Sequence, residues 1–107
     1  MSDGEDELYT VILSLKTALE CKAFFRDLCT PKEIKGMTDR LVVAKFLLQG
    51  DLSYREIHQK TQASLTTITR VARFLTQEPY QGYKLVLGKK DENNNINNNN
   101  SIRISCL

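Results

Sequence analysis

Residues 53–75 read SYREIHQKTQASLTTITRVARFL, and this stretch contains two segments with helical periodicity separated by about four residues. Ser53 and Glu56 form an S-x-x-E capping box that predicts the start of a helix over about 54–61. Ser64 can cap a second helix, over about 65–75. The second helix places four apolar residues on one face, Ile68, Val71, Ala72 and Leu75. Two helices with so short a connection predict a helix-turn-helix over about residues 53–75.

The second of these helices carries a polar, cationic face opposite its apolar stripe. On a helical wheel this face consists of Thr66, Thr69, Arg70 and Arg73, with Thr67 at its margin. The helix contains no acidic residue, whereas a merely solvated face usually mixes Glu and Lys. Threonine hydroxyls can reach phosphates or base edges. The pattern therefore favours a DNA recognition helix, with Arg55 and His58 on the preceding helix placed to contact the DNA backbone.

The composition supports a small domain that binds a polyanion. A chain of 107 residues with 41% apolar residues can build one core, and a core of this size is often completed by a second copy of the chain, so we expect a homodimer. The net charge is +2, but residues 53–90 hold seven Lys or Arg against two Glu. Residues 53–90 therefore carry a net charge of +5 and the rest of the chain −3. The basic part is expected to bind a polyanion such as DNA.

The rest of the chain is expected to be helical as far as residue 90. Helices are predicted over about 5–16 and 18–28, the second opened by a capping box of Thr17 and Glu20. A longer helix is opened by a capping box of Thr30 and Glu33, with Pro31 at its first position, and ends at Gly50. Its predicted inward face is Ile34, Met37, Leu41, Ala44 and Leu48.

Helical periodicity is lost beyond Pro79, and the segment YQGYKLVLGKKD could be an ordered arm, an edge strand or a dimer contact. Residues 1–90 are interpreted as a single helical DNA-binding domain. The asparagine-rich tail, 91–107, is predicted to be disordered because it has too few apolar residues to pack.

Several function classes are disfavoured by the residues present. The three cysteines form no C-x-x-C pair, so neither a disulfide framework nor a metal site is expected, and Cys21 and Cys29 are interpreted as reduced core residues. The only histidine, His58, has no partner constellation, and no phosphate loop is present, so neither an enzyme nor a cofactor is expected. The acidic N-terminus and the lack of a long apolar run predict a cytoplasmic protein without membrane contact.

The stretch CTPKEIKGMTDRLVVAKFLLQGDLSYREIHQKTQASLTTITRVARFLT resembles the bacterial Trp repressor family, in particular its YerC/YecD branch. The resemblance covers about residues 8–88 and includes FFRDLCTPKE and GYKLVL, which are typical of that branch. It implies an all-α, interwoven homodimer with a helix-turn-helix in each subunit, which represses transcription at palindromic operators. By motif, it also implies a set of DNA contacts: Arg55, His58, Ser64, Leu65, Thr66, Thr67 and Thr69.

The same resemblance bears on a small-molecule effector. The residues that surround L-tryptophan in the sensing members match Thr30, Arg40 and Arg70. Val71 stands in place of the small glycine that leaves room for the indole, and Phe74 replaces a serine, so we expect the protein itself to fill the cavity. The preferred hypothesis is a regulator that needs no L-tryptophan. A tryptophan-responsive repressor remains the alternative, and an effector of another kind stays open.

A rival hypothesis of another class is a protein-interaction adaptor that uses Tyr80, Tyr83 and Leu87 and does not bind DNA.

One departure from the usual helix-turn-helix weakens the DNA-binding match. Gln62 stands where the turn usually has a left-handed glycine, and a larger residue there costs roughly 1 kcal/mol.

Overall fold

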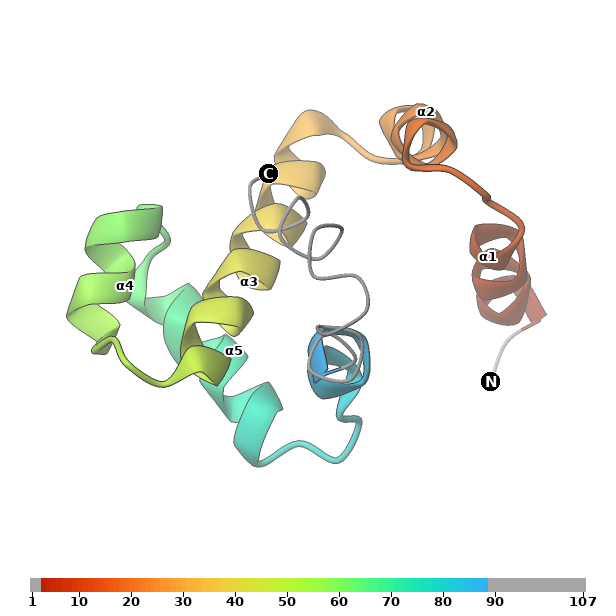
Figure 1. Cartoon of the computed structure of the whole chain (residues 1–107). Helices are drawn as coiled ribbons and strands as arrows, with labels where there is room; N and C mark the ends of the chain where they lie inside the picture. Colours follow the sequence, from red (N-terminus) through yellow and green to blue (C-terminus); the bar gives the residue numbers. More distant parts are fainter. Residues whose placement is uncertain (1–2, 89–107) are drawn as a thin grey trace, which may run out of the picture. The chain divides into compact units, whose positions relative to one another are not determined.

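The computed structural model describes residues 3–88, and these residues form helices and no strand. The helices are α1 (Asp3–Leu13), α2 (Ala18–Leu28), α3 (Pro31–Gln49), α4 (Tyr54–Thr61) and α5 (Leu65–Thr76), as labelled in Figure 1. A further helical segment covers residues 82–88. The predicted all-α class is confirmed. The asparagine-rich tail, Lys89, Lys90 and Cys106 lie outside the described residues.

The chain divides into two units, residues 1–36 and 37–107, and each is described by itself. In the first unit, the main-chain N–H of Glu20 donates to Thr17 Oγ1 at 3.1 Å, which starts α2 as predicted. The Glu20 carboxylate accepts from the N–H of Lys16 at 2.9 Å, so the second bond of the box reaches one residue further back than expected. Neither α1 nor α2 contains a buried residue.

The predicted first helix was misplaced by a few residues. It begins at Asp3 and ends at Leu13, whereas periodicity suggested about 5–16. The N–H groups of Ser14 and Leu15 donate to the carbonyls three residues back, at 3.0 and 3.1 Å. Such i to i−3 bonds tighten the last turn and end the α-helix before the apolar pattern is exhausted.

The interpretation of Cys21 and Cys29 as core residues is wrong for the single chain. Cys21 is exposed and Cys29 is only half-buried, and both are free thiols. The expectation rested on the general tendency of cysteine to be buried. It failed because α2 has no buried face within one chain.

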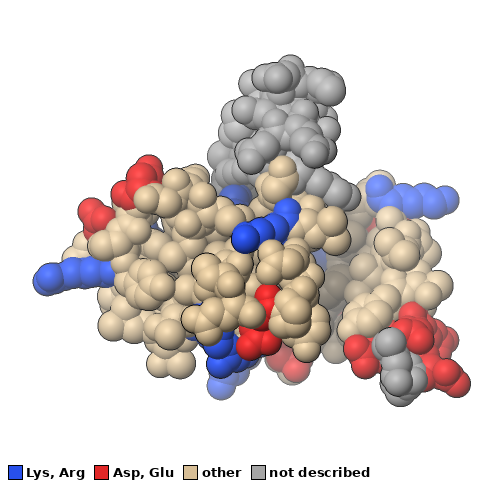
Figure 2. All heavy atoms as spheres, turned by 90° about the horizontal axis from the view of Figure 1, so that it is seen from below, with Lys and Arg blue, Asp and Glu red and all other residues tan. Residues whose placement is uncertain are grey.

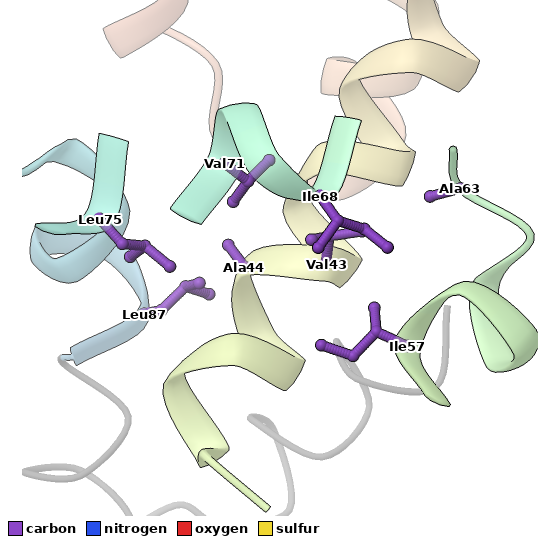
Figure 3. Close-up of a cluster of buried hydrophobic side chains, with 8 residues drawn as sticks. All are labelled: Val43, Ala44, Ile57, Ala63, Ile68, Val71, Leu75 and Leu87. Carbon is purple, nitrogen blue, oxygen red and sulfur yellow. The ribbon is translucent and has the colours of Figure 1, made fainter. Parts of the chain in front are cut away.

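The core of the second unit lies where α3, α4, α5 and the 82–88 segment meet. Figure 3 shows Ile57 of α4 and Ile68 of α5 pointing towards Val43 of α3, while Leu75 and Leu87 pack at the other end. The buried hydrophobic residues are Val43, Ala44, Ile57, Ala63, Ile68, Val71, Leu75 and Leu87. The stripe predicted for α5 is therefore confirmed at three positions, with Ala72 half-buried.

The inward face predicted for α3 is confirmed at Ala44, which is buried, and at Leu41, which packs against the core, but it is wrong at Met37 and Leu48. Val43 and Ala44 are fully enclosed, whereas Met37 and Leu48 of the predicted face are 36% and 41% exposed. Residues 41–48, LVVAKFLL, hold one charge in eight positions. A helix that is apolar on most sides has no unique stripe, so its periodicity cannot select the face that packs.

The segment after Pro79 is helical over residues 82–88, so the statement that helical periodicity ends there was wrong. Leu87 is buried and Tyr83 packs against the core from a half-buried position. These two residues are spaced i, i+4 and lie on one face of the 82–88 helical segment. Of the readings left open, an edge strand is therefore excluded for these residues, and the ordered arm fits.

The turn between α4 and α5 depends on a residue with positive φ. Gln62 adopts the left-handed conformation at φ 66°, as its position predicted, and its N–H donates to the His58 carbonyl at 2.8 Å. A side chain is strained in this region, and glycine is not. Gln62→Gly is therefore expected to raise the free energy of unfolding by up to about 1 kcal/mol, measured by urea denaturation.

The matched control is Gln59→Gly, which makes the same change inside α4. There the added backbone freedom should lower the free energy of unfolding by about 0.5–1 kcal/mol. If Gln62→Gly and Gln59→Gly both lower the free energy of unfolding by similar amounts, the account of strain at Gln62 is wrong.

Candidate nucleic-acid interface

The first helix of the pair is fixed at its start by a complete capping box. The N–H of Glu56 donates to Ser53 Oγ at 3.1 Å, and the N–H of Ser53 donates to Glu56 Oε1 at 2.8 Å. The backbone bond from Ser53, with a smaller contribution from its hydroxyl, lowers the pKa of Glu56 below its ordinary value. A carboxyl group whose pKa is lower in the folded than in the unfolded protein stabilises the folded state at pH values above the unfolded pKa. This contribution is lost as the pH falls through the folded pKa, so α4 is firmly capped at neutral pH.

The turn is held by side chains as well as by the backbone. His58 Nδ1 lies 2.6 Å from the carbonyl oxygen of Ala63. Because a carbonyl oxygen only accepts, Nδ1 must carry the proton. Thr61 Oγ1 donates to the Ile57 carbonyl at 2.7 Å and accepts from the N–H of Ala63 at 3.0 Å. His58 therefore positions the start of α5, and only its Nε2 is left to face a partner.

The second helix starts at Ser64, as predicted. Ser64 Oγ accepts from the N–H of Thr67 at 3.1 Å and lies 3.1 Å from Thr67 Oγ1. The two hydroxyl groups are thus bonded to each other, and Thr67 is half-buried. Leu65, Thr66 and Thr69 are exposed. The first turn of α5 consequently presents Leu65 and Thr66 beside its free main-chain N–H groups, which attract anions, and Thr69 follows one turn further along the helix.

Four of the residues predicted to contact DNA lie around one concave site. This α4–α5 hollow has a volume of about 480 Å³. It is lined by Tyr54, Arg55, His58, Leu65 and Thr69. Tyr54 was not predicted, although its spacing of i, i+4 from His58 and its 45% exposure place it on the same face of α4. Residues of both α4 and α5 thus form the hollow, on the outer side of the two helices.

Arg70 and Arg73 are placed differently, towards the C-terminal half of α5. Their guanidinium carbons lie 4.5 and 5.1 Å from the centre of the Phe74 ring, within cation–π range. Arg73 Nε also lies 3.4 Å from Glu78 Oε2, in an exposed ion pair of little energetic value. The Phe74 ring stacks on Tyr80 with centroids 6.4 Å apart. Both arginines are exposed, but neither lines the α4–α5 hollow.

The residues matched to a tryptophan site are divided between the two units. Thr30 lies in the first unit, where its Oγ1 accepts from the N–H of Glu33 at 3.1 Å. Arg40 and Arg70 lie in the second unit. Val71 is fully buried in the core and Phe74 is half-buried against Tyr80. The two substituted positions are therefore filled by packed side chains.

The charge of the described residues is uneven, as the sequence suggested. In the face shown in Figure 2, the densest group of Asp and Glu side chains lies on α1, and the part that contains α4 shows both acidic and basic side chains. The first turn of α1 holds Asp3, Glu5 and Asp6, whereas the first turn of α5 holds no acid. The surface of α5 is thus suited to an anionic partner.

Two kinds of site are not found within residues 3–88. No three His, Cys, Asp or Glu side chains there are grouped so that they could hold a metal ion. No helix in the same range has the length and apolar character needed to cross a membrane.

Comparisons with known proteins agree with this arrangement. The uncharacterized protein YerC from Bacillus subtilis (strain 168) is 49% identical over 70 residues, which is 65% of this chain and 66% of that protein. The match therefore spans just under two thirds of that relative's own length. A crystal structure of a candidate Trp repressor from Staphylococcus aureus superposes with a TM-score of 0.80 at 40% identity, over 85% of this chain and 89% of that one.

A TrpR-like protein from Eubacterium eligens ATCC 27750 superposes with a TM-score of 0.76 at 39% identity, over 82% of this chain and 89% of that one. The family model described as Trp repressor protein matches residues 4–91, which includes every helix described above except the first residue of α1. This is a family of DNA-binding regulators with a helix-turn-helix, and it is not a family of enzymes. The chain belongs to the Trp repressor family.

Proposed function

We propose that the protein is a sequence-specific transcriptional repressor that binds palindromic operators as a homodimer and does not need L-tryptophan. Residues 1–90 form its DNA-binding domain in this proposal, and its place of action is the cytoplasm. Each subunit inserts α5 into the major groove, and the two α5 helices lie about 34 Å apart to read half-sites one helical turn apart.

The observation that carries this proposal is the outer surface of α4 and α5. Arg55 and His58 of α4 border the same hollow as Leu65 and Thr69 of α5. A helix start with free N–H groups, exposed hydroxyls and a nearby guanidinium offers both phosphate and base contacts. We assign Arg55 to the phosphate backbone and Leu65, Thr66 and Thr69 to base edges. Ser64 and Thr67 lie at the helix start, and Arg70 and Arg73 supply further phosphate contacts along α5.

The homodimer is supported by apolar side chains that remain exposed within residues 3–88. On α1, Tyr9, Val11 and Leu13 are 51%, 38% and 84% exposed, and neither α1 nor α2 has a buried residue. Exposed apolar surface of this extent is typical of interfaces between protein chains. A second copy of the chain would cover it, as expected for an interwoven dimer.

Independence from L-tryptophan is supported by Val71 and Phe74. Val71 is fully buried, and the half-buried Phe74 ring contacts Tyr80 and two guanidinium groups. Titration of the full chain with L-tryptophan in a calorimeter is expected to give no binding heat up to millimolar ligand. Binding in the micromolar range would instead support the tryptophan-responsive alternative, with Thr30, Arg40 and Arg70 as its pocket.

The test of DNA binding starts from operator selection out of random duplexes. The selected duplex is expected to bind about 10³-fold or more tightly than random DNA at physiological salt. Removing one phosphate contact with Arg55→Ala should reduce the slope of log affinity against log salt by about one for each subunit that makes it.

The matched control is Arg26→Ala, which removes an exposed arginine from α2 and should leave the salt slope unchanged. No preference of the protein for any duplex over random DNA would refute the proposal. That result would favour the adaptor hypothesis with a corrected surface. Tyr80 is exposed as that hypothesis requires, but Leu87 is buried and Tyr83 half-buried, so the exposed Leu85 and Val86 would take their place.

A further inference from the structure

The α4–α5 hollow has a mixed character that a phosphate contact does not explain. Tyr54 and Leu65 line the hollow and are 45% and 56% exposed, although both side chains are large and mainly apolar. Phosphate oxygens are met by N–H and O–H donors and gain nothing from an apolar wall. The hollow is therefore built for a group that is partly apolar and partly polar.

The side chains of the hollow come in two pairs with helical spacing. Tyr54 and His58 are spaced i, i+4 on α4, and Leu65 and Thr69 are spaced i, i+4 on α5. On the opposite side of the same helices, Ile57 and Ile68 are fully enclosed in the core (Figure 3). Packing of the core thus fixes the two helices that form the walls.

The polar groups of the hollow have restricted roles. His58 Nδ1 is occupied by the Ala63 carbonyl at 2.6 Å, and this bond holds the ring at the wall. Thr69 contributes a methyl group and a hydroxyl that can donate a hydrogen bond. Among the described residues, none that lines the hollow is acidic, and Arg55 supplies a positive charge there. An electronegative partner with one methyl group and one acceptor would match these features.

We propose that the α4–α5 hollow receives the major-groove edge of one thymine in each half-site, with its C5 methyl against Leu65 and its O4 facing Thr69. This inference rests on the proposed DNA binding and adds the base that is read. Among the four bases, only thymine shows a methyl group beside an acceptor in the major groove. Leu65 and Thr69 are then the residues that determine specificity at that position.

The test replaces the thymines of the selected operator, one symmetric pair at a time, with deoxyuridine, which differs only by loss of the methyl group. At one position in each half-site, the affinity of the full chain should fall about fourfold per methyl, or roughly fifteenfold for both. Replacement at every other thymine should change the affinity less than twofold.

Variants then assign the methyl to the hollow. Leu65→Ala is expected to bind the thymine operator more weakly and to lose most of the difference between thymine and deoxyuridine. Thr69→Ser removes only the side chain's own methyl and should reduce that difference while it keeps the hydroxyl. The control is Thr76→Ala, which changes an exposed threonine at the end of α5 that neither lines the hollow nor is assigned to DNA, and it should keep the full difference.

The outcomes separate this inference from the proposed function. A chain that prefers no duplex refutes both. A chain that binds a selected operator but is insensitive to every thymine methyl refutes the inference alone. The same holds if Leu65→Ala and Thr69→Ser both keep the full methyl dependence, because the methyl group is then read elsewhere.

Discussion

Ile68→Ala is expected to lower the free energy of unfolding by about 2–5 kcal/mol. Ile68 is fully buried and meets Val43 of α3 and Ile57 of α4 in the core (Figure 3). Removing its outer carbons leaves a cavity among three helices that are held by other contacts and cannot collapse into it. Small domains are stable by only about 5–15 kcal/mol, so this single change removes a large part of the total.

The measurement is urea denaturation at one fixed protein concentration, because a dimer's stability depends on concentration. The matched control is Leu65→Ala, which removes the same number of carbons from the same helix at a position that is 56% exposed. Its effect should stay within about 0.5 kcal/mol, as is usual for surface substitutions. Equal losses in the two variants would show that α5 is not oriented as described.

Thr69→Glu is expected to weaken operator binding by about 1–3 kcal/mol per contact, a loss of roughly 5- to 150-fold in affinity. Thr69 is exposed and lines the α4–α5 hollow. A carboxylate there would face the phosphates and base acceptors of the proposed complex, and it could not donate the hydrogen bond of the hydroxyl. The fold should survive, because glutamate is a good helix former and position 69 is outside the core.

The readout is a fluorescence titration of the selected operator, with circular dichroism to confirm that the variant is folded. Thr10→Glu is the matched control, since it adds the same charge on the exposed side of α1. It should change operator affinity by less than twofold. If Thr69→Glu binds as tightly as the unchanged chain, α5 does not face the DNA in the proposed way.

Capping residues allowed much of the local structure to be predicted. The boxes at Thr30 and Ser53 formed as expected, with main-chain N–H to side-chain oxygen distances between 2.8 and 3.1 Å. A cap depends on residues three positions apart, so its geometry is contained in the sequence. The same is true of two residues with positive φ. Gln62, with φ 66°, ends α4, and Gly50, with φ 79°, follows α3.

The candidate site was predicted in part. Arg55, His58, Leu65 and Thr69 were named and lie around one hollow, whereas Tyr54 was missed. The role of His58 within the turn was also missed, because its bond to Ala63 spans five residues and depends on how the chain reverses. Arg70 and Arg73 were grouped with the threonines on the helical wheel. Both guanidinium groups instead lie over the Phe74 ring, and neither residue lines the hollow.

The sequence by itself determined the helices, their caps and the family, because periodicity and capping depend on neighbours along the chain. Only the tertiary structure decided which face of α3 is buried, that the segment after Pro79 is helical, and that Tyr54 joins the hollow. These features depend on which surfaces meet in space. In a helix that is apolar on most sides, several faces could pack equally well, and the partner helices select one of them.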